Sequence, residues 1–374
     1  MEIRKVDIAI LTVIPQELTA VKAALNIHDI PVNRSKTKDS QTIYLHGELF
    51  SERTKKTYSL ALGCIGNAGN YNSSQATTEV IQTYNPQLVI LVGIAAGIKG
   101  KAKLGEVVFS ERIVGYESAS LRQLNDGTKV EQPRPDMPSV PNGIFQDVTF
   151  YLATDKDRLS NNKQRLKASF LRTGGDFPVL CVDEQSHVQK EDIIDEIELD
   201  VCAIASGEKL LKDPSILENI RDNQHGRVKV GEMEAIGLAT ACQRMRRDWL
   251  VIRGISDFGD AYKSDVFHPL ASQTAATVLA DFIQYGLERE YSQESGKAIV
   301  QKPKEQVLKL LKNLLPSQFD EVLFKCGVDL AHLANGSQNQ KSIDLIRYVI
   351  QKEGEDLSQL LTVIYKVVPH MMER

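Results

Sequence analysis

The sequence lacks the features that mark membrane, disulfide-rich or zinc-binding proteins. No segment reaches the roughly 18 consecutive apolar residues that a membrane-spanning helix needs. The five cysteines are odd in number, widely separated and never arranged as C-x-x-C, which argues against a disulfide framework and against a zinc site. We therefore expect reduced thiols, no membrane span and no bound metal.

A strong excess of charge of one sign is also missing. The net charge is −4 at pH 7 and the pI is near 6.0, so nothing draws the chain as a whole to nucleic acid or to an anionic membrane. The first residues place Glu2, Arg4, Lys5 and Asp7 around a short apolar run, unlike the cationic and then apolar order of a signal peptide. These observations predict a cytoplasmic protein with no nucleic-acid or membrane partner.

The overall composition is that of a globular protein, and the chain length indicates more than one domain. A chain of 374 residues exceeds the usual single core, and 42% hydrophobic residues supply enough apolar side chains to fill two. Residues 288–304 turn polar, as linkers do. We predict a large domain over residues 1–290, a linker over 291–302 and a small helical domain over 303–374.

In the large domain, strand-like segments alternate with helix-like segments. Expected strands cover residues 6–14, 58–63, 87–92, 105–114 and 250–255, and expected helices cover 16–25, 73–83, 231–243 and 271–287. This alternation predicts an α/β fold whose mixed or parallel sheet is covered by helices and binds ligands at the carboxyl ends of its strands. Glycine-rich segments at Gly66 and from Gly93 to Gly97 follow two of these strands, and we expect both as loops.

Residues 116–143 interrupt this pattern with four prolines and many polar residues. They predict a long surface excursion, which is either a lid or binding loop or simply a solvated loop. The excursion extends to about residue 178 and is rich in cations, which either bind the phosphates of a nucleotide or form a solvated face. Among them are Arg122, Lys129, Arg134, Lys156, Arg158, Lys163, Arg165 and Lys167.

Three acidic residues lie where carboxylates would face the expected ligand crevice. Asp257 closes the strand that begins at Leu250, where it acts as a general acid or caps the next element. Glu234 begins one expected helix and is placed to accept hydrogen bonds from vicinal hydroxyls. Glu17 begins another and is placed to orient a water. For each of the two glutamates, a favourable charge on the helix dipole is the alternative.

Six segments in this order resemble the nucleoside phosphorylase and nucleosidase superfamily, and within it the methylthioadenosine/S-adenosylhomocysteine nucleosidase-like branch. They are residues 10–17, 63–67, 92–98, 104–108, 231–235 and 253–257. The resemblance covers about residues 6–287 and implies a mixed central sheet flanked by helices. It also implies a homo-oligomer that cleaves the N-glycosidic bond of a purine nucleoside or nucleotide without a metal or cofactor.

The resemblance assigns roles to the three acids and their neighbours. Asp257 would protonate N7 of the leaving base, with Ser256 helping to hold it. Met233 and Glu234 would bind the ribose, and Glu17 would activate the attacking water.

The resemblance also shapes the expected pocket for the base. Gly66, Gly93 and Ala95 would let the backbone approach the ligand closely. Leu210 stands where the small nucleosidases carry an aromatic residue, so it would pack on the purine without stacking.

Two other functions stay open on the sequence. A phosphorylase would need cations to hold its phosphate nucleophile, whereas residues 12–18 contain no arginine and do contain Glu17, which favours water. A nucleotide-binding regulatory module without turnover would keep the pocket, although the presence of all three acids argues against such decay.

The C-terminal segment predicts a separate helical domain. Expected helices cover residues 306–314, 316–326, 341–352 and 356–367, with apolar residues every three or four positions. Residues 311–324 and 342–348 resemble the effector-associated domain of bacterial conflict and signalling systems, a death-domain-like adaptor. The resemblance implies that residues 303–374 bind a helical adaptor domain of another protein and make the enzyme an effector in defence or signalling. A plain helical extension that packs on the catalytic domain is the alternative.

Overall fold

The computed structural model describes residues 5–28, 34–36, 42–152, 156–176, 188–260, 265–289, 303–328, 336–353 and 357–368. The chain divides into two compact units, residues 1–296 and 297–374. The linker predicted over residues 291–302 lies outside the described residues.

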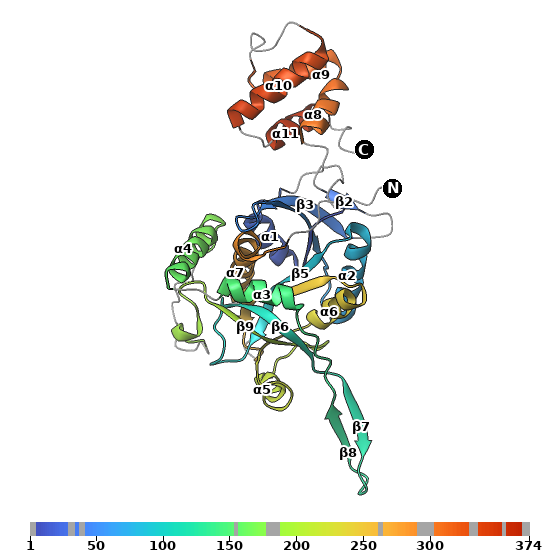
Figure 1. Ribbon diagram of the computed structural model, residues 1–374, viewed down its shortest axis with the longest axis vertical. Helices are drawn as coiled ribbons and strands as arrows, with labels where there is room; N and C mark the ends of the chain where they lie inside the picture. The colour runs from blue at the N-terminus through green and yellow to red at the C-terminus, as the bar shows by residue number, and fades with distance from the viewer. Residues whose placement is uncertain are drawn as a thin grey trace. The chain divides into compact units, whose positions relative to one another are not determined.

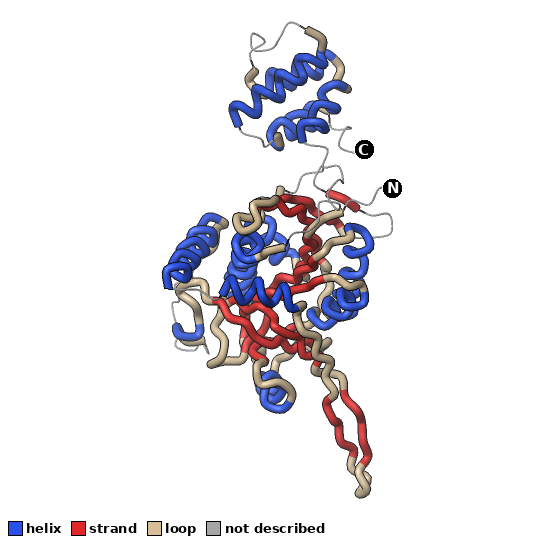
Figure 2. The backbone as a smooth tube through the Cα atoms, in the orientation of Figure 1, coloured by secondary structure: helices blue, strands red, loops and turns tan. Residues whose placement is uncertain are grey.

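Within the described part of the first unit, nine strands form one mixed sheet (Figures 1 and 2). In spatial order they are β10 (Val228–Glu232), β9 (Leu199–Ser206), β6 (Val107–Gly115), β11 (Asp248–Asp257), β5 (Leu88–Gly97), β1 (Ile8–Thr12), β4 (Thr57–Cys64), β3 (Ile43–Phe50) and β2 (Arg34–Lys36). The predicted α/β class with a mixed central sheet is confirmed. Its central strands β4, β1, β5 and β11 run parallel, so their carboxyl ends share one edge.

Helices cover both faces of this sheet (Figure 1). On one face α1 (Pro15–Ala24) packs against α7 (His268–Asp281), and on the other α2 (Asn70–Tyr84) packs against α6 (Ala235–Arg244). The remaining helices are α3 (Asn142–Leu152), α4 (Lys156–Arg172) and α5 (Pro214–Asn223). Strands buried on both faces need continuous apolar sequences, and β1 (IAILT) is buried at every position.

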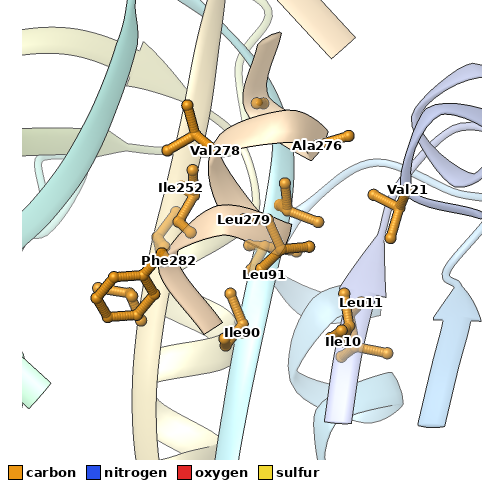
Figure 3. Close-up of a cluster of buried hydrophobic side chains, with 14 of the residues drawn as sticks. Ile10, Leu11, Val21, Ile90, Leu91, Ile252, Ala276, Val278, Leu279 and Phe282 are labelled. Atoms are coloured by element: carbon orange, nitrogen blue, oxygen red, sulfur yellow. The ribbon is translucent and has the colours of Figure 1, made fainter. Parts of the chain in front are cut away.

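The core between the sheet and α7 is apolar and closely packed (Figure 3). Ile10 of β1, Ile90 of β5 and Ile252 of β11 come from three adjacent strands. Leu279 and Phe282 reach them from α7 and the single π-helical turn that follows it, Phe282–Gly286. This packing holds in place the strands whose carboxyl ends form the site.

An additional pairing closes part of the sheet on itself. Besides pairing with β9, β10 pairs antiparallel with β5, with Gly231 opposite Ala96, so that β5, β11, β6, β9 and β10 form a ring. The segment from Gly93 to Gly97, expected as a loop, is instead the end of β5. That expectation was wrong because β11 and β10 supply backbone partners on both sides of these small residues.

One further expectation needs correction, and one predicted segment contains more regular structure than the sequence indicated. The helix predicted from residue 231 begins at Ala235, because the preceding residues belong to β10. The excursion at residues 116–143 contains a hairpin of β7 (Ala119–Gln123) and β8 (Lys129–Pro133), which projects from the domain (Figure 1). Asp126 and Gly127 form its turn, and Gly127 has φ +87°. An Asp-Gly pair is a strong signal for a β-hairpin, and here the hairpin forms although prolines lie nearby.

The second unit contains the expected helices. They are α8 (Pro303–Lys312), α9 (Pro316–Lys325), α10 (Gln338–Glu353) and α11 (Ser358–Val367). Val307, Leu311, Leu345 and Ile364 are buried and come from three of these helices, so the unit has an apolar core of its own. In the described part of either unit, no helix combines the length and apolarity that a bilayer crossing requires.

We predict that Gly254→Ala strongly destabilises the large unit. An added Cβ at Gly254 of β11 would overlap the backbone carbonyl oxygen of Ala271 in α7, which cannot rotate away. Overpacking of this kind costs about 1–3 kcal/mol. Urea denaturation measures the loss, with Gly226→Ala as the control because open space surrounds Gly226. Equal stability of the two variants would contradict the packing described for β11 and α7.

Candidate active site

A pocket of about 210 Å³ opens at the strand ends of the ring. Its lining comes mainly from the segment after β1, the end of β5, the segment after β9, the end of β10 and the end of β11, and is completed by Ala68 and His268. Seven residues predicted as site residues line it: Glu17, Ala95, Leu210, Met233, Glu234, Ser256 and Asp257. Segments more than 200 residues apart in sequence therefore meet in one cavity.

Glu17 is fixed by three backbone amides. It lies in the first turn of α1, and its side chain turns back toward the end of β1. Oε2 accepts hydrogen bonds from the N–H groups of Val13 (2.7 Å) and Ile14 (3.1 Å), while Oε1 accepts one from Ile94 (2.9 Å). These donors stabilise a negative charge on a carboxylate that is almost fully buried.

Glu234 immediately precedes α6 and points into the same cavity. Its Oε1 accepts a hydrogen bond from the N–H of Gly69 (3.1 Å), and its Oε2 lies 3.1 Å from the guanidinium of Arg253. Burial and the nearby charge of Glu232 raise the pKa of Glu234 to about 7, although Arg253 opposes the shift.

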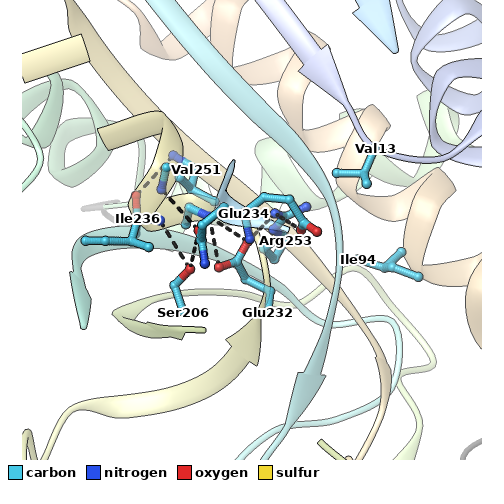
Figure 4. Close-up of polar contacts among 12 residues, drawn as sticks. Val13, Ile94, Ser206, Glu232, Glu234, Ile236, Val251 and Arg253 are labelled. Carbon is cyan, nitrogen blue, oxygen red and sulfur yellow. Dashed lines mark hydrogen bonds and ion pairs between the residues drawn. The ribbon is translucent and has the colours of Figure 1, made fainter. Parts of the chain in front are cut away.

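Two charged residues of this cluster, Glu232 and Arg253, were not predicted from the sequence (Figure 4). Arg253 is fully buried in β11 and its Nη2 contacts the carboxylates of both Glu232 and Glu234. Glu232 also accepts hydrogen bonds from the N–H groups of Glu234 and Ala235, each at 3.0 Å. One signal was available: Arg253 is the single charge within the apolar run from Leu250 to Ile255.

Asp257 ends β11 and its carboxyl is held by its own neighbours. Oδ1 accepts the N–H of Gly259 (2.8 Å), and the hydroxyl of Ser256 lies 2.9 Å from Oδ2. The same hydroxyl lies 3.3 Å from the carbonyl oxygen of Ala95. Asp257 is thus oriented from both sides and still lines the pocket.

The two predicted positions outside the lining, Gly93 and Gly66, and the exposed lining residue Leu210 have different structural roles. Gly93 lies behind the cavity, where an added Cβ would overlap Arg253 and Glu17. Gly66 follows β4 with φ +82° and donates its N–H to the carbonyl of Val13 (2.9 Å), outside the pocket lining. Leu210 lines the pocket and stays 54% exposed.

Most of the charged side chains that line this largely apolar pocket are carboxylates. Glu17, Glu232, Glu234 and Asp257 line it, and the charge of Arg253 is already used by two of them. Such an arrangement suits hydroxyl donors and a cationic transition state and repels free phosphate. Within the described ranges, no group of three or more His, Cys, Asp or Glu side chains is arranged to hold a metal ion.

The large unit is similar in sequence to known proteins. Residues 7–146 match the family model described as phosphorylase superfamily. The ATP nucleosidase Cap17 of Escherichia coli (strain KTE188) is 36% identical over 280 residues, which cover 75% of this chain and 51% of that protein. The chain thus spans about half the length of this curated relative. The 5′-methylthioadenosine/S-adenosylhomocysteine nucleosidase of Bacillus thuringiensis (strain Al Hakam) is 22% identical over 247 residues, covering 66% of this chain and 89% of that protein.

Solved structures agree on the fold. The 5′-methylthioadenosine/S-adenosylhomocysteine nucleosidase of Helicobacter pylori matches with a TM-score of 0.51 at 16% identity, covering 76% of this chain and 99% of that chain. The corresponding Colwellia psychrerythraea enzyme, solved with adenine, also gives 0.51, at 14% identity, covering 78% of this chain and all of that one. The family match and the two curated relatives confirm the superfamily resemblance: the chain carries a phosphorylase superfamily domain, and the relatives named here are nucleosidases.

Proposed function

We propose that the chain is an N-ribosyl hydrolase that releases the base from a purine nucleoside or nucleotide, and that it acts in the cytoplasm. The observation that carries the proposal is the convergence of Glu17, Glu234 and Asp257 on one pocket. The names of the relatives support it, since they describe nucleosidases for ATP and for methylthioadenosine or S-adenosylhomocysteine.

Asp257 is assigned to the leaving base. A purine leaves more readily when N7 is protonated, because electrons of the C1′–N9 bond then flow into a neutral base. The carboxyl of Asp257, oriented by Ser256 and Gly259, lines the pocket and donates this proton. The ribosyl group is left with positive charge at C1′, which the surrounding carboxylates stabilise.

Glu234 and Met233 are assigned to the ribose. The carboxylate of Glu234 has lone pairs beyond those used by Gly69 and Arg253, and vicinal hydroxyls donate to them. Met233 lines the same part of the cavity and supplies a flexible apolar contact. The ribose is then held beside the cationic centre that forms on it.

Glu17 is assigned to the nucleophile. A water oxygen attacks C1′ while one of its protons passes to the carboxylate of Glu17. The amides of Val13, Ile14 and Ile94 would make an anion site, but Glu17 occupies it. A phosphate nucleophile therefore finds its donors taken, which favours hydrolysis over phosphorolysis.

We predict that Asp257→Asn reduces base release by at least about 100-fold while the fold persists. The amide cannot donate the proton but keeps the shape of the carboxyl. Chromatography of free base measures release from adenosine, methylthioadenosine, S-adenosylhomocysteine, inosine, AMP, ATP and NAD, with and without phosphate. Asp222→Asn, an exposed change on α5, is the control.

The same panel decides between the alternatives. Dependence of base release on added phosphate would identify a phosphorylase. Tight ligand binding without any release by the unsubstituted protein would identify a regulatory module. Full activity of Asp257→Asn would overturn the role of this residue.

We predict that ribose binding weakens about tenfold as the pH falls from about 8 to about 6. Glu234 has its pKa raised to about 7, so its acceptor carboxylate is present above that pH and is replaced by the acid form below it. Calorimetric titration of the Asp257→Asn variant with adenosine measures the affinity. Glu234→Gln on the same background is expected to bind more weakly at every pH. If the Gln variant showed the same pH dependence, another group would be responsible.

For the second unit, we propose a role as an adaptor that recruits the enzyme to a helical domain of another protein. The support is its separate apolar core and the resemblance of residues 311–324 and 342–348 to effector-associated domains. On this proposal the domains are catalytic (1–290), linker (291–302) and adaptor (303–374), and the enzyme is an effector in a bacterial defence or signalling system. The catalytic unit is proposed to work as a homo-oligomer, as the superfamily resemblance implies.

We predict that a chain ending at residue 296 keeps its fold and its base-releasing activity. The sheet, helices α1 to α7 and the site all lie within residues 1–296. Thermal unfolding of the shortened chain is expected within a few degrees of the full chain, with an unchanged KM. An insoluble product, or one without activity when the full chain is active, would contradict the proposed division.

A further inference from the structure

One side of the pocket is a short exposed segment, residues 208–210, here called the pocket wall. Glu208, Lys209 and Leu210 follow the buried end of β9, and the next residue, Leu211, is buried again. Lys209 and Leu210 line the cavity although both are exposed. Side chains with so little packing around them hold their place only if their backbone is anchored.

Glu117 supplies such an anchor from a distant part of the chain. It lies between β6 and β7, where the hairpin leaves the sheet. Its Oε2 accepts a hydrogen bond from the backbone N–H of Glu208 (2.8 Å), and its Oε1 lies 3.4 Å from Nζ of Lys209. The first contact joins a charged acceptor to the backbone and is the stronger one, because Lys209 is well exposed to solvent.

The residues beside this contact tie it to the site. Tyr116 packs over Gly207, where an added Cβ would overlap the tyrosine ring. The N–H of Gly207 donates to the carbonyl oxygen of Glu232 (3.2 Å), whose side chain binds Arg253. The residue before the wall is therefore bonded to the backbone of Glu232, and the wall itself contacts Glu117 through Glu208 and Lys209.

We propose that Glu117 is a positioning residue: it holds the pocket wall, and with it Leu210, against the base of the substrate. The proposal rests on the function proposed above. Glu117 does not line the cavity and touches no proposed catalytic carboxylate, so it acts on substrate affinity through the wall and leaves the bond-breaking step unchanged.

Hydrogen exchange and steady-state kinetics test this with two substitutions. Glu117→Ala removes the acceptor, so exchange in a peptide covering residues 207–211 accelerates. KM for the best substrate of the panel rises about tenfold, and kcat stays within about twofold. Glu117→Gln keeps a side-chain oxygen that accepts from the N–H of Glu208, and it restores both quantities. Glu131→Ala, an exposed change in the same hairpin, matches the unsubstituted protein in both.

The possible failures can be told apart. Unchanged exchange and unchanged KM in Glu117→Ala would overturn the proposal. Faster exchange throughout the large unit, with a lower Tm, would show that Glu117 stabilises the fold in general, and would overturn it as well. If the unsubstituted protein releases base from no substrate, the proposed function fails, while the exchange of residues 207–211 still decides whether Glu117 holds the wall.

Discussion

The structure of the site depends on one buried interaction, the guanidinium of Arg253 between the carboxylates of Glu232 and Glu234. A charge buried so completely would cost several kcal/mol if it were unpaired. Pairing with two carboxylates offsets that cost and joins β11 to the end of β10 and the start of α6. Gly93 of β5 leaves the space that the guanidinium occupies. Four elements are thereby locked around one cation.

This cation also explains how several carboxylates coexist in a small cavity. Glu232 is committed to Arg253 and to the first amides of α6, so it serves mainly as structure. Glu234 shares the same guanidinium, but burial and the charge of Glu232 raise its pKa to about 7, so its carboxyl changes charge near neutral pH. Glu17 is instead surrounded by backbone donors. Similar side chains are thus suited to different tasks by their partners.

The structure was hardest to predict from the sequence where strand pairing or side-chain contacts join distant parts of the chain. Nothing local distinguishes the end of β5 from a glycine-rich loop, because its strand character comes from β10 and β11 on either side. The anchoring of residues 208–210 by Glu117 joins positions 91 residues apart. The β7–β8 hairpin is different, since its Asp-Gly turn was visible in the sequence and the surrounding prolines obscured it.

The sequence by itself determined the α/β class, the C-terminal helices, the superfamily and seven of the residues that gather in the pocket. It did so because apolar periodicity and short motifs are local properties of a chain. Only the tertiary structure decided that Arg253 organises the acids, that three amides hold Glu17 and that Glu117 reaches the pocket wall. The reason is physical: a carboxylate acquires its role from donors and charges around it, and those come from segments that folding alone brings together.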